Sequence, residues 1–371
     1  MCEQRRLLRS AVLSLVLAVP AACSDPLAPE TYAATQPEDT SRIRIVIPEV
    51  YELANVIIAM TTYGNASPSA VFRIGAYYQR VHSAFSPFRS HASMQNLQLG
   101  TSNPVLRYYS LRDNSFAYVF EDDELRRIPG SNTFWDPNLF RERMSAIQQF
   151  SDASGFRAFF AANASYYRDV IDRYRSMAQV DSIADWLERE FRPVRYRHYT
   201  VALSPLVYAS HSAQFGPGMD EATFFVSGPD VSGGRNASEG VRKATVQRIL
   251  FTEIDHAFVD PTTSTHRLPV NDAFGVRAKW TTDTSSFYDS PAAVFNEYMT
   301  WATFLLFLHG RVSPQDYEVV RENVVSVMQQ TRRFHRFGVF ATELSRLYLG
   351  LPDGGTVVDL YPAILDWAAQ Q

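Results

Sequence analysis

The stretch RILFTEIDHAFVDP, residues 248–261, places charged and ionisable side chains at helical spacing within an apolar run. Glu253 and His256 are three positions apart, and Thr252 lies one turn before His256. A helix would therefore carry all three on one side. That side could be the wet face of an ordinary amphipathic helix, or it could belong to a site.

The periodicity of the surrounding residues predicts a helix over 241–259, and Pro261, two residues later, is expected to end it. Upstream, residues 43–190 repeat apolar side chains at spacings of three and four, which predicts a mainly helical part. Segments 197–209 and 221–229 are rich in β-branched and aromatic residues and are predicted strands. The expected fold class is α+β, mainly helical with a small β-sheet.

A second long helix is predicted from Ser290-Pro291 to near His309-Gly310, because serine followed by proline is typical of a helix start. Apart from His309, Glu297 is its only acidic or basic residue, and helical geometry puts Glu297 on the apolar side. A buried carboxylate is costly unless it is paired, hydrogen-bonded or bound to metal. Glu297 therefore needs a partner, which could be a metal, backbone donors or a buried arginine.

The N-terminal segment predicts export from the cytoplasm. Residues 1–22 carry arginines before a short apolar run and resemble a bacterial lipoprotein signal, with Cys23 as the expected lipidation site. Pro20 departs from that pattern, so ordinary secretory cleavage nearby is the alternative. Residues 23–42 are polar and Pro-rich and are expected to form a tether. The predicted location is the cell envelope, at the membrane through a lipid anchor or secreted.

Composition excludes several function classes. The formal net charge is −4 and no block of like charge stands out, so no nucleic-acid partner is expected. Cleavage before Cys23 would remove Cys2 and leave a modified Cys23, which excludes a thiol enzyme. The chain has no G-x-S-x-G, P-loop or G-x-G-x-x-G motif.

The order of strands, glycine-rich loop, E-x-x-H helix and later glutamate resembles that of gluzincin-type zinc peptidases. FTEIDHAFVDP further resembles the H-E-x-x-H-x-F-V-N-P segment of an uncharacterised family of bacterial secreted proteins. The likeness extends from about Ile43 to Leu308 and includes the segments IPEVYELANVIIAMTTYG, AYYQRVHSAFSPFRSHA and NEYMTWA. The resemblance implies a zincin-like part at 191–371, and we expect residues 43–371 to form one compact unit.

The resemblance also implies roles for single residues. Glu253 would be the general base, and His256 and Glu297 would be zinc ligands. Thr252 stands where the family has its first histidine, and a hydroxyl is a poor zinc ligand. Asp255 cannot replace it, because it points about 100° away from His256 around the helix.

Other histidines could fill the gap. His211, between the two predicted strands, and His266, after the helix, are the candidates, although each could equally be an ordinary loop residue. His82 and His91 flank an aromatic segment and could line a cleft. A metzincin pattern is excluded because position 262 is Thr, and a di-iron site would need a second E-x-x-H.

Two functions compete at this point. The chain is either a metal-dependent peptidase that uses zinc, or a pseudo-peptidase that binds peptide or protein in the former active-site cleft without cutting it. Thr252 favours the second function, whereas Glu253, His256 and Glu297 favour the first. A purely structural lipoprotein, with Glu297 neutralised by an arginine, is the third possibility.

Overall fold

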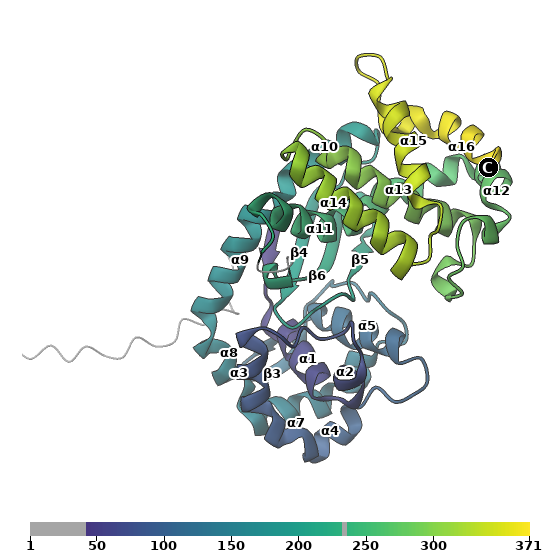
Figure 1. Cartoon of the computed structure of the whole chain (residues 1–371). Coiled ribbons are helices and arrows are strands. Elements are labelled where there is room, and N and C mark those ends of the chain that lie inside the picture. The colour runs from purple at the N-terminus through teal and green to yellow at the C-terminus, as the bar shows by residue number, and fades with distance from the viewer. Residues whose placement is uncertain (1–41, 232–235) are drawn as a thin grey trace, which may run out of the picture. The chain divides into compact units, whose positions relative to one another are not determined.

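The computed structural model describes residues 42–231 and 236–371, which all belong to one compact unit. The expected signal peptide, the lipidation site Cys23 and nearly all of the expected tether lie outside the described residues. Within the described ranges the chain is mainly helical with a small sheet, so the predicted α+β class is confirmed (Figure 1).

The main sheet has four strands in the order β1-β4-β6-β5. Strands β1, β4 and β6 are parallel, whereas β5 runs antiparallel to β6 and forms one edge. The two predicted strands are confirmed as β4 and β6, although β4 is shorter than the predicted segment. Sequence reasoning missed β5 and treated it as loop. The bounds are β1 (Ile43–Val46), β4 (His198–Ser204), β5 (Ser212–Phe215) and β6 (Glu221–Ser227).

The two faces of this sheet pack against different helices, because successive side chains of a strand point to opposite faces. On one face, the ring of Phe225 lies 5.4 Å from that of Tyr51 in helix α1. On the other face, Phe224 stacks on Tyr199, with ring centroids 6.3 Å apart. Helix α11 packs against β5 and β6.

Residues 43–190 are helical as predicted, apart from β1 and a two-stranded hairpin, β2 (Tyr118–Glu121) with β3 (Glu124–Arg127). The α-helices of this part are α1 (Glu49–Met60), α2 (Thr62–Ala66), α3 (Ala76–Phe85), α4 (Ala92–Leu97), α5 (Pro104–Asn114), α6 (Leu139–Glu142), α7 (Met144–Ser154), α8 (Phe156–Ala162), α9 (Ala164–Ala178) and α10 (Val180–Glu190).

Helix α11 (Glu239–Thr265) carries the E-x-x-H segment and is longer than predicted. Ser238 begins it by accepting a hydrogen bond from the Val241 N–H at 3.1 Å. The expected stop at Pro261 is wrong, because the helix continues through the proline. Proline removes one backbone donor, but the Thr262 hydroxyl donates to the carbonyl oxygen of Phe258 at 2.8 Å and stabilises the following turn.

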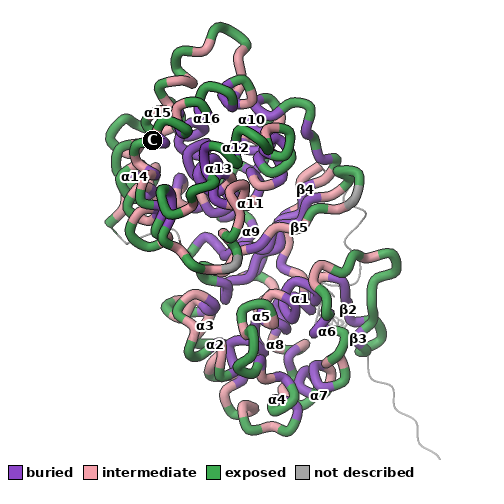
Figure 2. The backbone as a smooth tube through the Cα atoms, turned by 90° about the vertical axis from the view of Figure 1, so that its right-hand side faces the viewer, coloured by how far each residue is buried: buried purple, intermediate pink, exposed green. Residues whose placement is uncertain are grey.

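Helix α13 (Pro291–Leu308) begins and ends close to the predicted positions. Its N-cap Ser290 accepts a hydrogen bond from the Ala293 N–H. Helix α13 packs against α11 and α15, and Figure 2 shows most of its length as buried. The other helices of this part are α12 (Arg267–Phe274), α14 (Pro314–Ser326), α15 (Phe337–Leu349) and α16 (Tyr361–Ala369), with a π-helical turn η7 (Val327–Thr331) after α14.

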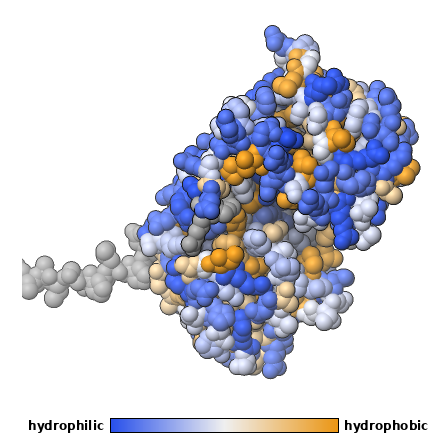
Figure 3. Space-filling model, in the orientation of Figure 1, coloured by the Kyte–Doolittle hydropathy of each residue, from blue (hydrophilic) through white to orange (hydrophobic). Residues whose placement is uncertain are grey.

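The surface is mixed in polarity. On the face shown in Figure 3, hydrophobic side chains gather around a recess, and most of the remaining surface is hydrophilic. Across residues 42–231 and 236–371, none of the helices combines the length and the apolar character that a membrane crossing requires.

Candidate functional site

A cavity of about 590 Å³ is the meeting point of the sequence candidates, and we call it the main cavity. Its wall is formed by α5, the segment before α6, the edge strand β5, α11, α13 and the end of η7. Glu253, His256 and Glu297 all line it, and so does Thr252. The side of α11 that could have been an ordinary solvent-exposed helix face therefore lines a cavity.

Of the two other histidines considered, only His211 lines the main cavity. It lies directly before β5, with Nε2 3.0 Å from the carbonyl oxygen of Tyr208. Burial and the charges of Arg112 and Arg248 lower the pKa of His211 to about 3, so its imidazole is neutral. His266 caps the far end of α11 instead, where its ring lies 4.8 Å from that of Tyr361.

Histidines 82 and 91 do not line the main cavity. His82 lies within α3, with its ring 5.8 Å from that of Tyr78. His91 is the N-cap of α4, and its Nδ1 is 2.8 Å from the hydroxyl oxygen of Ser93. Both histidines therefore contact residues of their own helices and do not belong to the candidate site.

Glu297 has protein partners for its buried carboxylate. The indole Nε1 of Trp301 donates to Glu297 Oε1 at 2.8 Å. The guanidinium of Arg332, at the end of η7, forms an ion pair with the same oxygen and also donates to the Tyr288 hydroxyl. An arginine partner, which sequence reasoning allowed as an alternative to metal, is therefore present, although Arg332 is only partly buried.

The hydroxyl of Thr252 is used within its own helix. Thr252 Oγ1 donates to the carbonyl oxygen of Arg248 at 3.0 Å, one turn earlier. Threonine commonly satisfies its hydroxyl this way inside helices. At the position of the first zinc ligand in the resembled family, the chain thus offers a hydroxyl that is already bonded.

His256 is held in its protonated form by a neighbouring carboxylate. Its Nδ1 lies 3.5 Å from Oδ1 of Asp260, one turn further along α11. Burial lowers the pKa of His256, but the hydrogen bond to Asp260 and the charges of Glu297 and Glu253 outweigh it and raise the pKa to about 9. A protonated imidazole has no lone pair for a metal ion.

These donors do not fit a zinc ion. Within residues 42–231 and 236–371, no three His, Cys, Asp or Glu side chains are grouped so that they could hold a metal. The expected zinc ligands His256 and Glu297 therefore share a cavity wall without forming a ligand set, and neither His211 nor His266 completes one. The physical reasons are that Arg332 already binds the carboxylate of Glu297 and that Thr252 offers a bonded hydroxyl where an imidazole would be needed.

Glu253 differs from these residues because it has no hydrogen-bond or salt-bridge partner in the described ranges. Burial raises the pKa of Glu253 to about 7, with His256 opposing the rise and Glu297 adding to it. Near neutral pH this carboxyl exists in both protonation states. It can therefore accept or donate a proton or a hydrogen bond toward a bound ligand.

Arg248 is the second unpartnered charge in the main cavity. Its guanidinium lies over the ring of Trp301, with Cζ 4.8 Å from the ring centroid. Burial and the charge of Arg332 lower the pKa of Arg248 to about 10, so it stays protonated at neutral pH. Sequence reasoning missed Arg248, although it is the first residue of the stretch RILFTEIDHAFVDP and lies one turn before Thr252.

A buried ion pair contacts residues that line the main cavity. Arg112 and Asp113 are both fully buried, and Arg112 Nε donates to Asp113 Oδ1 at 2.7 Å. Asp113 Oδ2 accepts a hydrogen bond from Trp135 Nε1 at 2.7 Å and one from the Ser212 hydroxyl at 2.8 Å. The pair thereby fixes Trp135 and the start of β5 at the wall.

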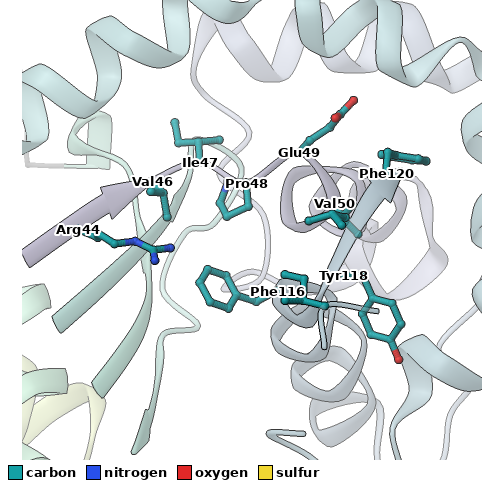
Figure 4. Close-up of a pocket in the computed structure, with 11 residues that line it drawn as sticks. Arg44, Val46, Ile47, Pro48, Glu49, Val50, Phe116, Tyr118 and Phe120 are labelled. Atoms are coloured by element: carbon teal, nitrogen blue, oxygen red, sulfur yellow. The ribbon is translucent and has the colours of Figure 1, made fainter. Parts of the chain in front are cut away.

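Two further cavities are present, of which one adjoins the main cavity and the other lies elsewhere. One of about 400 Å³ adjoins the main cavity and shares His256, Phe287, Tyr288 and Glu297 with it, and we call it the side cavity. The other, of about 180 Å³, is mostly apolar and lies between the start of α1 and strand β2 (Figure 4). Its Glu49 is already paired with Arg157, and none of the sequence candidates lines it.

Comparison of the chain with protein-family models, with curated proteins and with solved structures finds no match.

Proposed function

We propose that the chain is a peptidase-like binding protein that holds a peptide in the main cavity without zinc-dependent cleavage. The observation that carries this proposal is the edge strand β5, whose residues Ser212, Ala213 and Gln214 line the main cavity. Within the described ranges β5 pairs with β6 alone, so its other side can accept an extended peptide as an added strand.

The dimensions of the site support an extended ligand. The main cavity, at about 590 Å³, is within the range of ordinary ligand pockets. The side cavity continues from it along a shared wall that includes His256 and Tyr288. A peptide that pairs with β5 could therefore place different side chains in the two cavities.

The lining also supports a peptide. Aromatic rings of Tyr109, Trp135, Tyr288 and Trp301 border the main cavity, and Phe287 borders both cavities. Aromatic side chains bind apolar peptide side chains over a large contact area and tolerate different sequences. Two unpartnered charged groups, Glu253 and Arg248, supply polar contacts.

A metal-dependent hydrolase is the second candidate, and Glu253 is the observation that favours it. Its pKa of about 7 and its position on the cavity wall suit a general base. The ion pair of Glu297 with Arg332 and the bonded hydroxyl of Thr252 oppose this candidate. We also propose that the protein is located at the cell envelope, from the signal-like N-terminal sequence and Cys23.

The proposal is tested with an acetylated pentapeptide of Ala, Val and Phe that has a free carboxyl end, measured by calorimetry. We expect saturable binding, and we expect an analogue with N-methylated backbone amides to bind at least about tenfold more weakly, because it cannot pair with β5. Mass spectrometry with and without added zinc should find the peptide intact. Zinc-dependent cleavage would favour the hydrolase, and no binding of either peptide would refute the proposal.

A further inference from the structure

Most of the charged side chains in or beside the main cavity have a partner of opposite charge. Glu297 is paired with Arg332, and His256 lies beside Asp260. The buried Arg112 is likewise paired with Asp113. Arg248 is the exception among the cations named here, since no hydrogen bond or ion pair to its guanidinium exists within the described ranges.

The position of Arg248 suits ligand binding. Its guanidinium packs on the ring of Trp301, which leaves the edge of the group and its N–H donors free for another partner. Arg332 also lies over the ring of Trp301, with Cζ 5.1 Å from the centroid, but its charge is used by Glu297. The two arginines thus share one aromatic support and differ in whether they are neutralised.

The acidic group that interacts electrostatically with Arg248 does not form an ion pair with it. Glu253 is five residues after Arg248 on α11 and interacts with it electrostatically, but the two form no hydrogen bond. Residues five apart on a helix do not lie directly above one another. A cavity that keeps an unpaired cation beside aromatic walls is expected to bind an anion there.

We infer that Arg248 binds a carboxylate of the peptide ligand. The inference rests on the proposed function and names the chemical group that the site recognises. One planar guanidinium can bind a carboxylate with two parallel hydrogen bonds. A carboxylate is favoured over a doubly charged phosphate because the unpaired carboxyl group of Glu253, which lines the same cavity, repels the larger negative charge more strongly when it is ionised.

The carboxylate can come from the C-terminus of the peptide or from an Asp or Glu side chain. Three acetylated pentapeptides of one Ala, Val and Phe sequence separate these sources. The first ends in a free carboxylate, the second ends in an amide, and the third ends in an amide but carries one Glu in place of Ala. Calorimetric titration of the full chain with each peptide gives the dissociation constants.

We expect at least one carboxylate-bearing peptide to bind about tenfold or more tightly than the neutral amide. In Arg248→Gln that preference should vanish, because the remaining donor cannot supply a charge. In Arg248→Lys part of the preference for a carboxylate should return, because lysine keeps the positive charge but cannot form two parallel hydrogen bonds to the carboxylate. Arg242→Gln, on the same helix but outside the main cavity, should keep the preference of the wild type.

Each other outcome has a distinct meaning. Equal binding of all three peptides by the wild type would overturn the role of Arg248 and leave the proposed function standing. No binding of any peptide would overturn both. If Arg248→Gln unfolds, the Lys variant and the comparison of acid with amide in the wild type still decide the question. A preference that survives unchanged in a folded Arg248→Gln variant would also overturn the inference.

Discussion

Arg332 and Glu297 form an ion pair in the wall of the main cavity, on the same carboxylate oxygen that accepts the indole N–H of Trp301. Glu297 lies on α13 and Arg332 at the end of η7, so the pair also joins two elements that are distant in the sequence. A carboxylate bound in this way is not free to hold a metal, which changes what a substitution at Thr252 can achieve.

Zinc binding should therefore require two substitutions. Thr252→His supplies an imidazole one turn before His256, but Glu297 stays bound to Arg332, so we expect weak zinc binding from this variant alone. Thr252→His combined with Arg332→Met frees the carboxylate and completes three ligands, and it should bind zinc at least about tenfold more tightly. Titration against a competing chelator measures both affinities, with Arg332→Met alone as the control.

Two results would contradict this view of the site. Tight one-to-one zinc binding by the wild type would mean that the donors regroup around the ion and would favour the hydrolase. The absence of any gain in the double variant would mean that α11 is not related to a metal-binding helix.

Loss of the Asp113 carboxylate should destabilise the fold and the cavity wall together. Asp113→Asn leaves the fully buried charge of Arg112 without its counter-ion, which typically costs about 3–5 kcal/mol. Urea unfolding should show this loss. Asp172→Asn, which breaks an exposed pair with Arg175, should cost less than about 1 kcal/mol. Equal losses in the two variants would show that the buried pair is not a main support of the wall.

Glu52 should make the stability of the fold depend on pH. Glu52 is fully buried on α1, where it accepts a hydrogen bond of 2.7 Å from the Tyr77 hydroxyl, and Tyr167 contacts Tyr77 in turn. Burial raises the pKa of Glu52 from 4.5 to about 8, with hydrogen bonds from Ser204 and Tyr77 opposing the rise. The folded chain therefore keeps a proton that the unfolded chain releases, and stability falls as pH rises from about 4.5 to about 8.

The variant Glu52→Gln tests this dependence, because glutamine cannot ionise. Relative to the wild type it should gain stability between pH 5 and pH 8, by on the order of a few kcal/mol in the free energy of unfolding. Urea unfolding across this range measures the difference, and the exposed Glu322→Gln serves as the control. A constant difference between Glu52→Gln and the wild type at all pH values would refute the shift.

Membrane attachment should depend on Cys23. Replacing it with serine removes the expected lipidation site, and the protein should then leave the membrane fraction, since stable attachment of a lipoprotein needs its acyl chains. Fractionation of cells that express each form gives the result, and metabolic labelling with a fatty acid reports the modification itself. A serine variant that still sediments with membranes would refute lipidation at Cys23 as the anchor.

The sequence by itself determined the elements whose signals are local. The period of apolar residues predicted the helices of residues 43–190 and helix α13, and the β-branched segments predicted β4 and β6, because these patterns reflect burial on one side of a single element. It also predicted that Glu297 is buried and in need of a partner, since no other charge accompanies it on α13. The short edge strand β5 was missed because four residues of mixed polarity carry no clear pattern.

Only the tertiary structure decided what those side chains meet. It brings Arg332 to Glu297 and leaves Arg248 unpaired against Trp301 in the same cavity. These contacts depend on how α11, α13 and η7 pack, and no spacing within one segment encodes them. A burial pattern belongs to one helix, whereas a partner for a charge belongs to the packing of several, which is why the sequence could name Glu297 but not the residue that neutralises it.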